Sequence, residues 1–194
     1  MKKPRGLIFD FDGTLVDSMP LHWRAWDSVC QRHGIEFSEQ RHNSLGGMPS
    51  RKILAMLKKE QGLDFDPAAL SREKEEAYLP LMGEVKLIEP VAAIAREHRG
   101  KIPMSIATGG RTQFIEPLLE QVGIADWFCA LVTSDDVVNP KPAPDTFLKA
   151  AALMGVTAEA CRAYEDTDLG LQSIRAAGMD AVDVREILQP RAVV

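Results

Sequence analysis

Two carboxylates, Asp10 and Asp12, stand two positions apart at the start of the pattern Asp-x-Asp-Gly-Thr. Residues i and i+2 of an extended segment project to the same side, so both groups could act on one ligand. One could attack as a nucleophile while the other moves a proton. The alternative is a turn or a fragment of a calcium loop, but an EF-hand loop begins on a helix and continues to a later glutamate. Here residues 6–9, an apolar run typical of a buried strand, precede the pair.

Polar groups also follow other apolar runs that we interpret as strands. Helical patterns closed by glycine separate these runs from residue 85 onward, which predicts an α/β fold: a parallel sheet with helices on both faces. Ligands of such sheets bind beyond the carboxyl ends of the strands, so we expect the polar groups to converge there. The runs are 102–107, ending at Thr108, then 130–133, and then 162–164, ending at Glu165 and Asp166.

A site of this composition suits phosphoryl transfer, in which negative charge on the phosphate oxygens must be stabilised. Hard oxygen ligands for Mg²⁺ would come from three carboxylates and one backbone carbonyl. Hydroxyl groups, backbone amides and a lysine would bind the phosphate. The predicted metal ligands are Asp10, Glu165, Asp166 and the carbonyl of Asp12; the predicted phosphate-binding residues are Thr14, Thr108, Gly109 and Lys141.

The composition excludes several other classes of protein. The 194 residues carry 23 basic and 28 acidic side chains, a net charge of −5, and 45% of them are hydrophobic. This balance predicts a folded chain without the basic face that nucleic acid or an anionic membrane would need. The first apolar run is too short for a signal peptide, so we expect a cytoplasmic protein, and a monomer. Three dispersed cysteines fit no disulfide framework and are interpreted as small buried residues: Cys30, Cys129 and Cys161.

Residues 17–81 interrupt the alternation of strands and helices, because only helical patterns occur there. We predict that they form an all-helical domain inserted after the first strand. Residues 1–16 and 82–194 then form the catalytic core. Within the core, Pro117 falls inside a helical pattern and is expected to bend that helix or delay its start.

The four motifs together resemble the haloacid dehalogenase superfamily. They are Asp10-x-Asp12-Gly13-Thr14, Thr108, Lys141-Pro-Ala-Pro-Asp145, and Glu165-Asp166 followed by Gly170. The resemblance covers nearly the whole chain and implies a Rossmann-like core with a mobile helical cap. It also implies an aspartyl-phosphate at Asp10, acid–base action by Asp12, and Mg²⁺. The dehalogenases themselves lack the second aspartate, so this pattern favours phosphate chemistry.

Within that superfamily the cap resembles the β-phosphoglucomutase branch and its bacterial sugar phosphatases, for which fructose 1-phosphate and 6-phosphogluconate are examples of substrates. The candidate substrate-binding residues of the cap are His22, Trp26, Gly47, Arg51 and Lys74. For His22 and Trp26 the alternative is packing between helices, since they lie four positions apart. For Lys74, which stands in a run of mixed charge, the alternative is a solvated helix face.

Three departures from the mutase pattern favour hydrolysis. Thr14 stands where the mutase has a valine, Gly110 stands where it has a serine, and the segment 45–51 displaces an arginine that would hold a second phosphate. Weaker retention of a bisphosphate leaves water as the easier acceptor. We therefore predict a Mg²⁺-dependent phosphatase of a small sugar phosphate, with a β-phosphoglucomutase-like phosphohexomutase as the enzymatic alternative. A receiver-like signalling module that carries a phosphoacceptor aspartate is the non-enzymatic alternative.

Overall fold

A computed structural model describes residues 3–189 and contains two compact units. Ser18–Val85 form a helical unit, and the described residues on either side of it form the core unit. The predicted helical insertion ended at residue 81. The helical unit extends further because the 3₁₀ helix Leu79–Glu84 continues directly from the preceding helix and belongs to the same unit.

The core unit is built on a five-stranded sheet in which all strand pairs are parallel. The strand order is β3-β2-β1-β4-β5, so β1 lies in the middle. The predicted α/β fold class is therefore confirmed, although β5 was not predicted because it has only two apolar residues, with an aspartate on each side. The strands are β1 (Gly6–Phe9), β2 (Met104–Ala107), β3 (Ala130–Val132), β4 (Cys161–Glu165) and β5 (Asp180–Asp183).

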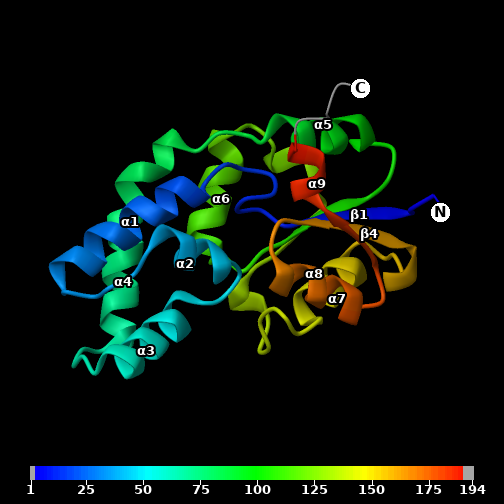
Figure 1. The fold of residues 1–194 in the computed structure, drawn as a ribbon. Helices are drawn as coiled ribbons and strands as arrows, with labels where there is room; N and C mark the ends of the chain where they lie inside the picture. Colours follow the sequence, from blue (N-terminus) through cyan, green and yellow to red (C-terminus); the bar gives the residue numbers. More distant parts are fainter. Residues whose placement is uncertain (1–2, 190–194) are drawn as a thin grey trace, which may run out of the picture. The chain divides into compact units, whose positions relative to one another are not determined.

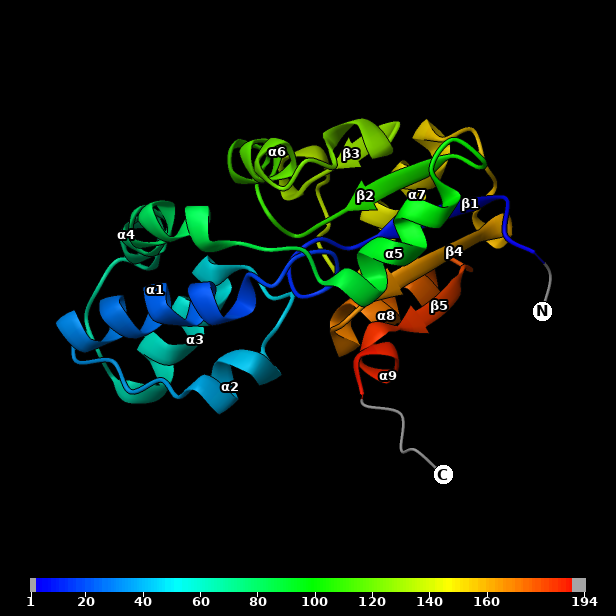
Figure 2. The same cartoon turned by 90° about the horizontal axis from the view of Figure 1, so that it is seen from above.

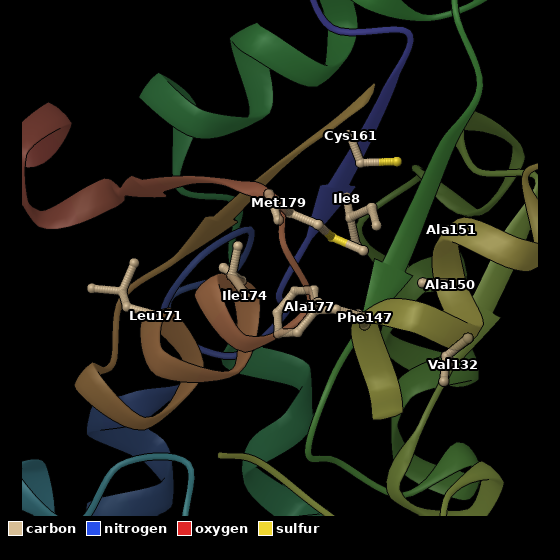
Figure 3. Close-up of a cluster of buried hydrophobic side chains, with 12 residues drawn as sticks. Ile8, Val132, Phe147, Ala150, Ala151, Cys161, Leu171, Ile174, Ala177 and Met179 are labelled. Atoms are coloured by element: carbon tan, nitrogen blue, oxygen red, sulfur yellow. The ribbon is translucent and has the colours of Figure 1, made fainter. Parts of the chain in front are cut away.

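Helices cover both faces of this sheet, as Figure 1 shows. On one face lie α7 (Asp145–Leu153) and α8 (Asp168–Ala176), and on the other lie α5 (Glu89–His98) and α9 (Val184–Leu188). The face under α7 and α8 is apolar because small and branched side chains of the strands meet Phe147, Leu171 and Ile174 there (Figure 3).

Of the two effects expected of Pro117, a delayed start of the helix is wrong, and a bend stays a prediction. Helix α6 spans Thr112–Gln121 and contains Pro117 in its interior. The helix begins upstream because the Asp135 carboxylate accepts a hydrogen bond from the Thr112 N–H at 3.0 Å, which satisfies one of the free donors of the first turn.

The helical unit packs around its own apolar cluster. Figure 2 shows its helices, which are α1 (Met19–Arg32), α2 (Glu39–Ser44), α3 (Ser50–Gln61) and α4 (Pro67–Tyr78). Apolar side chains of α1, α3 and α4 meet inside the unit, so each amphipathic helix covers the apolar face of another. The cluster contains Trp26, Val29, Cys30, Ile35, Ile53, Leu54, Leu57 and Leu70.

Two of the three cysteines are buried, as predicted, and burial raises the pKa of the Cys30 and Cys161 thiols to about 11. The prediction is wrong for Cys129, which is exposed. It directly precedes β3, one of the two edge strands of the sheet, and its thiol donates to the Met104 carbonyl at 3.3 Å. Among the helices of residues 3–189, none has the length and apolar character that crossing a bilayer requires.

Candidate active site

A buried lysine joins two carboxylates at the carboxyl ends of adjacent strands. Lys141 Nζ donates to Asp10 Oδ1 at 2.6 Å and to Glu165 Oε2 at 2.7 Å. All three side chains are nearly inaccessible, with exposed fractions of 3% for Lys141, 7% for Asp10 and 1% for Glu165. Phe147 covers the ammonium group, whose nitrogen lies 4.9 Å from the ring centroid.

The register of the sheet explains why these groups meet. Phe9 of β1 pairs with Tyr164 of β4, and the Asp10 N–H donates to the Tyr164 carbonyl at 3.0 Å. The next residue along each strand is therefore Asp10 on one side and Glu165 on the other. The spacing of residues within one segment cannot bring them together, whereas two parallel strands in register do so automatically.

Asp166 adds a third carboxylate to the pair. One oxygen from each of Asp10, Glu165 and Asp166 lies within 4.8 Å of the other two. Thr14 Oγ1 orients Asp166 by donating to its Oδ1 at 3.0 Å. Three hard oxygen donors in this arrangement fit a small divalent cation.

The site holds more acidic groups than basic ones, and burial makes their negative charge unfavourable. The pKa of Asp10 is raised well above its usual value, first by burial and then by the Glu165 charge, although Lys141 opposes the rise. Burial, followed by the charge of Glu165, raises the pKa of Asp166 to about 7. Burial opposes protonation of Lys141, but Asp10 and Glu165 raise its pKa overall. One ammonium faces three carboxylates, so a divalent cation would offset the remaining charge.

Asp12 and Thr108 lie on the segments that follow β1 and β2. The Asp12 carboxylate is not a member of the acidic cluster. It lies beside Gly110, since a β-carbon built on Gly110 would be 3.4 Å from Asp12 Oδ2. Thr108 is buried, and its Oγ1 accepts from the Gly110 N–H at 3.0 Å. The hydroxyl of Thr108 is therefore held in place by its own loop, while the neighbouring Gly109 is exposed.

Three predicted substrate-binding residues of the helical unit lie close to one another. Lys74 Nζ is 2.9 Å from His22 Nδ1, and the His22 ring stacks on Tyr78 with 4.0 Å between centroids. Lys74 is only 7% exposed, so the alternative of a solvated face is wrong. Trp26 is 2% exposed within the apolar cluster, and its ring lies 5.2 Å from that of Phe37, as the helix-packing alternative requires.

The other two candidates of the helical unit, Gly47 and Arg51, are exposed. Gly47 has a φ of 82°, a conformation that favours glycine, and Arg51 lies in the first turn of α3.

Sequence reasoning missed one residue that contacts the acidic cluster. Thr167 Oγ1 donates to Glu165 Oε1 at 2.6 Å. A signal was present, because a threonine that directly precedes a helical pattern is a typical N-cap, and this one follows the pair Glu165–Asp166 immediately.

Comparison with solved structures shows the class of fold. The β-phosphoglucomutase of Clostridium difficile has a TM-score of 0.82 at 23% identity, with 93% of this chain and 84% of that chain covered. CbbY from Rhodobacter sphaeroides, solved in complex with phosphate, has a TM-score of 0.80 at 25% identity, with 92% and 84% covered. The chain thus has the α/β core and inserted helical region of these proteins.

Comparison of sequences shows the family. A model described as haloacid dehalogenase-like hydrolase matches residues 7–184, so the chain belongs to this family of enzymes. The fructose-1-phosphate phosphatase YqaB of Escherichia coli K12 is 41% identical over 180 residues, which cover 93% of this chain and 96% of that protein. The β-phosphoglucomutase of Bacillus subtilis is 28% identical over 189 residues, which cover 93% and 83%.

Proposed function

We propose that this chain is a Mg²⁺-dependent phosphatase that hydrolyses a small sugar phosphate, such as fructose 1-phosphate or 6-phosphogluconate. The observation that carries the proposal is the buried network in which Lys141 joins Asp10 and Glu165 beside Asp166. The similarity to a fructose-1-phosphate phosphatase at 41% identity supports the class of substrate.

The donor set fits Mg²⁺, since Asp10, Glu165 and Asp166 offer carboxylate oxygens and no soft ligand joins them in the described residues. When bound, Mg²⁺ would neutralise charge on the phosphate oxygens as the phosphoryl group moves. Lys141 holds Asp10 in position and adds positive charge beside it. Without such charge, a carboxylate could not approach an anionic phosphate.

Asp10 is the proposed nucleophile. One of its carboxylate oxygens forms a bond to phosphorus while the bond from phosphorus to the sugar oxygen breaks, and protonated Asp12 gives its proton to the leaving alkoxide. Water then attacks the phosphorus of the aspartyl-phosphate, and Asp12 takes a proton from that water. Cleavage of the acyl-phosphate bond releases inorganic phosphate and restores the carboxylate of Asp10. Thr14, Thr108 and Gly109 are proposed to bind the phosphate oxygens.

The absence of a side chain at Gly110 supports hydrolysis over the mutase alternative. A β-carbon on Gly110 would lie 2.6 Å from Ile115 Cδ1, so Ile115 fills the space that a side chain at position 110 would need. A serine, which the mutase pattern has here, would require Ile115 to move. With glycine at position 110, the chain has no hydroxyl there that could bind a second phosphate.

We propose that substrate choice lies in the helical unit, which would act as a cap. Four polar or flexible positions are the candidates. They are His22, Gly47, Arg51 and Lys74. Trp26 is better explained as a packing residue that supports Lys74, whose Nζ lies 6.0 Å from the Trp26 ring centroid.

A phosphate-release screen over sugar monophosphates, with Mg²⁺ or with EDTA, tests the proposed function. Asp10→Asn should abolish release, whereas the matched control Asp168→Asn should retain it, because Asp168 is an exposed residue paired with Arg185. Wild-type turnover by folded, metal-replete Asp10→Asn would refute the nucleophile assignment. Isomerised product with catalytic bisphosphate would instead indicate a mutase, and a long-lived phosphoprotein without phosphate release would indicate a signalling module.

A further inference from the structure

The carboxylate of Glu165 is enclosed by the start of helix α8. Its Oε1 accepts from the Thr167 hydroxyl at 2.6 Å and from the Thr167 N–H at 3.1 Å. Its Oε2 accepts from Lys141 Nζ at 2.7 Å. Both oxygens of a carboxylate that is 1% exposed therefore have donors from the protein. The carboxylate has one defined orientation rather than several.

The Thr167 hydroxyl has two roles at once. It donates to Glu165, and it also accepts from the Gly170 N–H at 3.1 Å, which makes Thr167 the N-cap of α8. The position of the helix and the position of the Glu165 carboxylate are thus linked through one oxygen atom. A helix cap alone would need only the second of these contacts.

Gly170, the third residue of α8, completes the enclosure by having no side chain. A β-carbon built on it would lie 2.0 Å from Glu165 Cδ and 2.3 and 2.4 Å from the two carboxylate oxygens. Backbone conformation does not explain this glycine, because Gly170 is not among the glycines with positive φ. Alanine is also the better helix former. The glycine is required by the space that the Glu165 carboxylate occupies.

Gly13 shows the same relation to Asp166, since its β-carbon would lie 2.4 Å from Asp166 Oδ2. Gly13 has a φ of 81°, however, so conformation and space both favour glycine there. Of these two glycines, only Gly170 is explained by the need for space alone.

We propose that Thr167 and Gly170 are positioning residues for the acidic cluster, acting together through the carboxylate of Glu165. Thr167 donates a hydrogen bond to one oxygen of that carboxylate. Gly170 has no side chain, and this provides the space in which the Glu165 carboxylate contacts Lys141. The metal part of this inference rests on the proposed function. The geometric part concerns the ion pair between Glu165 and Lys141 and requires no metal.

The test uses the full chain with Gly170→Ala and a matched control, Gly83→Ala. Gly83 lies in the 3₁₀ helix Leu79–Glu84, and a β-carbon there would meet no atom within 4 Å. Isothermal titration with Mg²⁺, without substrate, should show a Kd about 10-fold or more weaker for Gly170→Ala and unchanged for the control. In EDTA, the Tm of Gly170→Ala should fall by about 5 °C or more as the buried ion pair is displaced, although helix propensity alone would raise it.

A second pair of variants removes and keeps the hydroxyl of Thr167. Thr167→Val should weaken Mg²⁺ binding about 10-fold, and Thr167→Ser should bind within about 3-fold of the wild type. Asp66→Ala controls for the loss of an N-cap, because Asp66 caps α4 of the helical unit through the Ala68 N–H. It should lower the Tm without changing the Kd for Mg²⁺. Equal Kd values for the valine and serine variants would overturn the role of Thr167.

Shortening the side chain at position 165 separates positioning from a general structural effect. In a Glu165→Asp background the carboxylate withdraws by one methylene group, so Gly170→Ala should lower the Tm less than in the wild type. An equal fall in both backgrounds, or a Gly170→Ala protein that matches the wild type in Tm and in Kd, would overturn the proposal. If the wild type bound no Mg²⁺, the proposed function would fail, while the comparison of Tm values in EDTA would still decide the positioning role.

Discussion

Replacing Lys141 by methionine removes the single ammonium from the buried acidic cluster and keeps most of the side-chain volume. The lysine nitrogen lies 2.6 Å from Asp10 and 2.7 Å from Glu165, and all three side chains are at most 7% exposed. Removing one partner of a buried pair leaves an uncompensated charge and typically costs about 3–5 kcal/mol. Two carboxylates lose their partner here, so we expect the upper part of that range at pH 8 in EDTA, a fall in Tm of roughly 10–20 °C.

The pH dependence of Lys141→Met follows from the same charges. Burial already raises the pKa of Asp10, and Lys141 is the group that opposes this rise. Without the ammonium, the Asp10 pKa lies still further above that of an unfolded aspartate, so the folded variant binds more protons than the unfolded one. Its stability should therefore rise as the pH falls toward about 4, and the deficit relative to the wild type should shrink. Added Mg²⁺ should also reduce the deficit, because it brings positive charge to the same carboxylates.

Urea unfolding of the metal-free proteins at pH 5 and pH 8 measures these differences. Lys149→Met is the matched control. Lys149 pairs with Asp136 at 3.0 Å, but both side chains are more than a third exposed, so its loss should cost at most about 1 kcal/mol. If Lys141→Met were no less stable than Lys149→Met, or if its deficit did not shrink at pH 5, the reasoning about uncompensated buried charge would be wrong.

Three further predictions concern single groups. The Asp166 pKa of about 7 lies above that of an unfolded aspartate, so the folded protein holds this proton more tightly than the unfolded chain. As the pH rises from 4 to 7, the metal-free wild type should therefore lose up to about 1.4 kcal/mol of stability per pH unit. Urea unfolding at several pH values should show a weaker slope for Asp166→Asn. Trp26→Ala should lower the free energy of unfolding by about 3–5 kcal/mol, since Trp26 is 2% exposed, and a loss below 1 kcal/mol would contradict its place in the apolar cluster. Ser105→Ala should be neutral or stabilising by up to about 1 kcal/mol in urea unfolding, because the buried Ser105 Oγ has no hydrogen-bond partner among the described residues; a clear destabilisation would show a partner.

Much of the core unit could be predicted because its signals are local. The apolar run 6–9 matches β1, and glycine stops lie at the ends of the predicted helices. β5 and α9 were missed because their signals are weak: β5 has acidic residues at both ends and α9 has only five residues. Cys129 was misassigned for a related reason, since residue type favours burial but the edge position of β3 leaves that cysteine exposed.

The burial of Lys74 could not be predicted from its local sequence. Lys74 stands in a run of mixed charge, so a solvated face was the alternative to substrate binding, yet its side chain lies against His22 and Tyr78 in the helical unit. Helical periodicity places residues on a face but does not say which neighbouring helix covers that face. The partner of a charged group, and so the free energy of burying it, depends on contacts between segments that are distant in the sequence.

The amino-acid sequence by itself determined which chemical groups are available at the ends of the strands and in the loop that follows β3: Asp10, Thr108, Lys141, Glu165 and Asp166. Only the tertiary structure decided that β1 and β4 are neighbours in register, which sets Asp10 beside Glu165 and makes room for one lysine between them. The physical reason is that side-chain chemistry belongs to single residues, whereas distance, burial and the resulting pKa belong to pairs of residues that chain folding brings together.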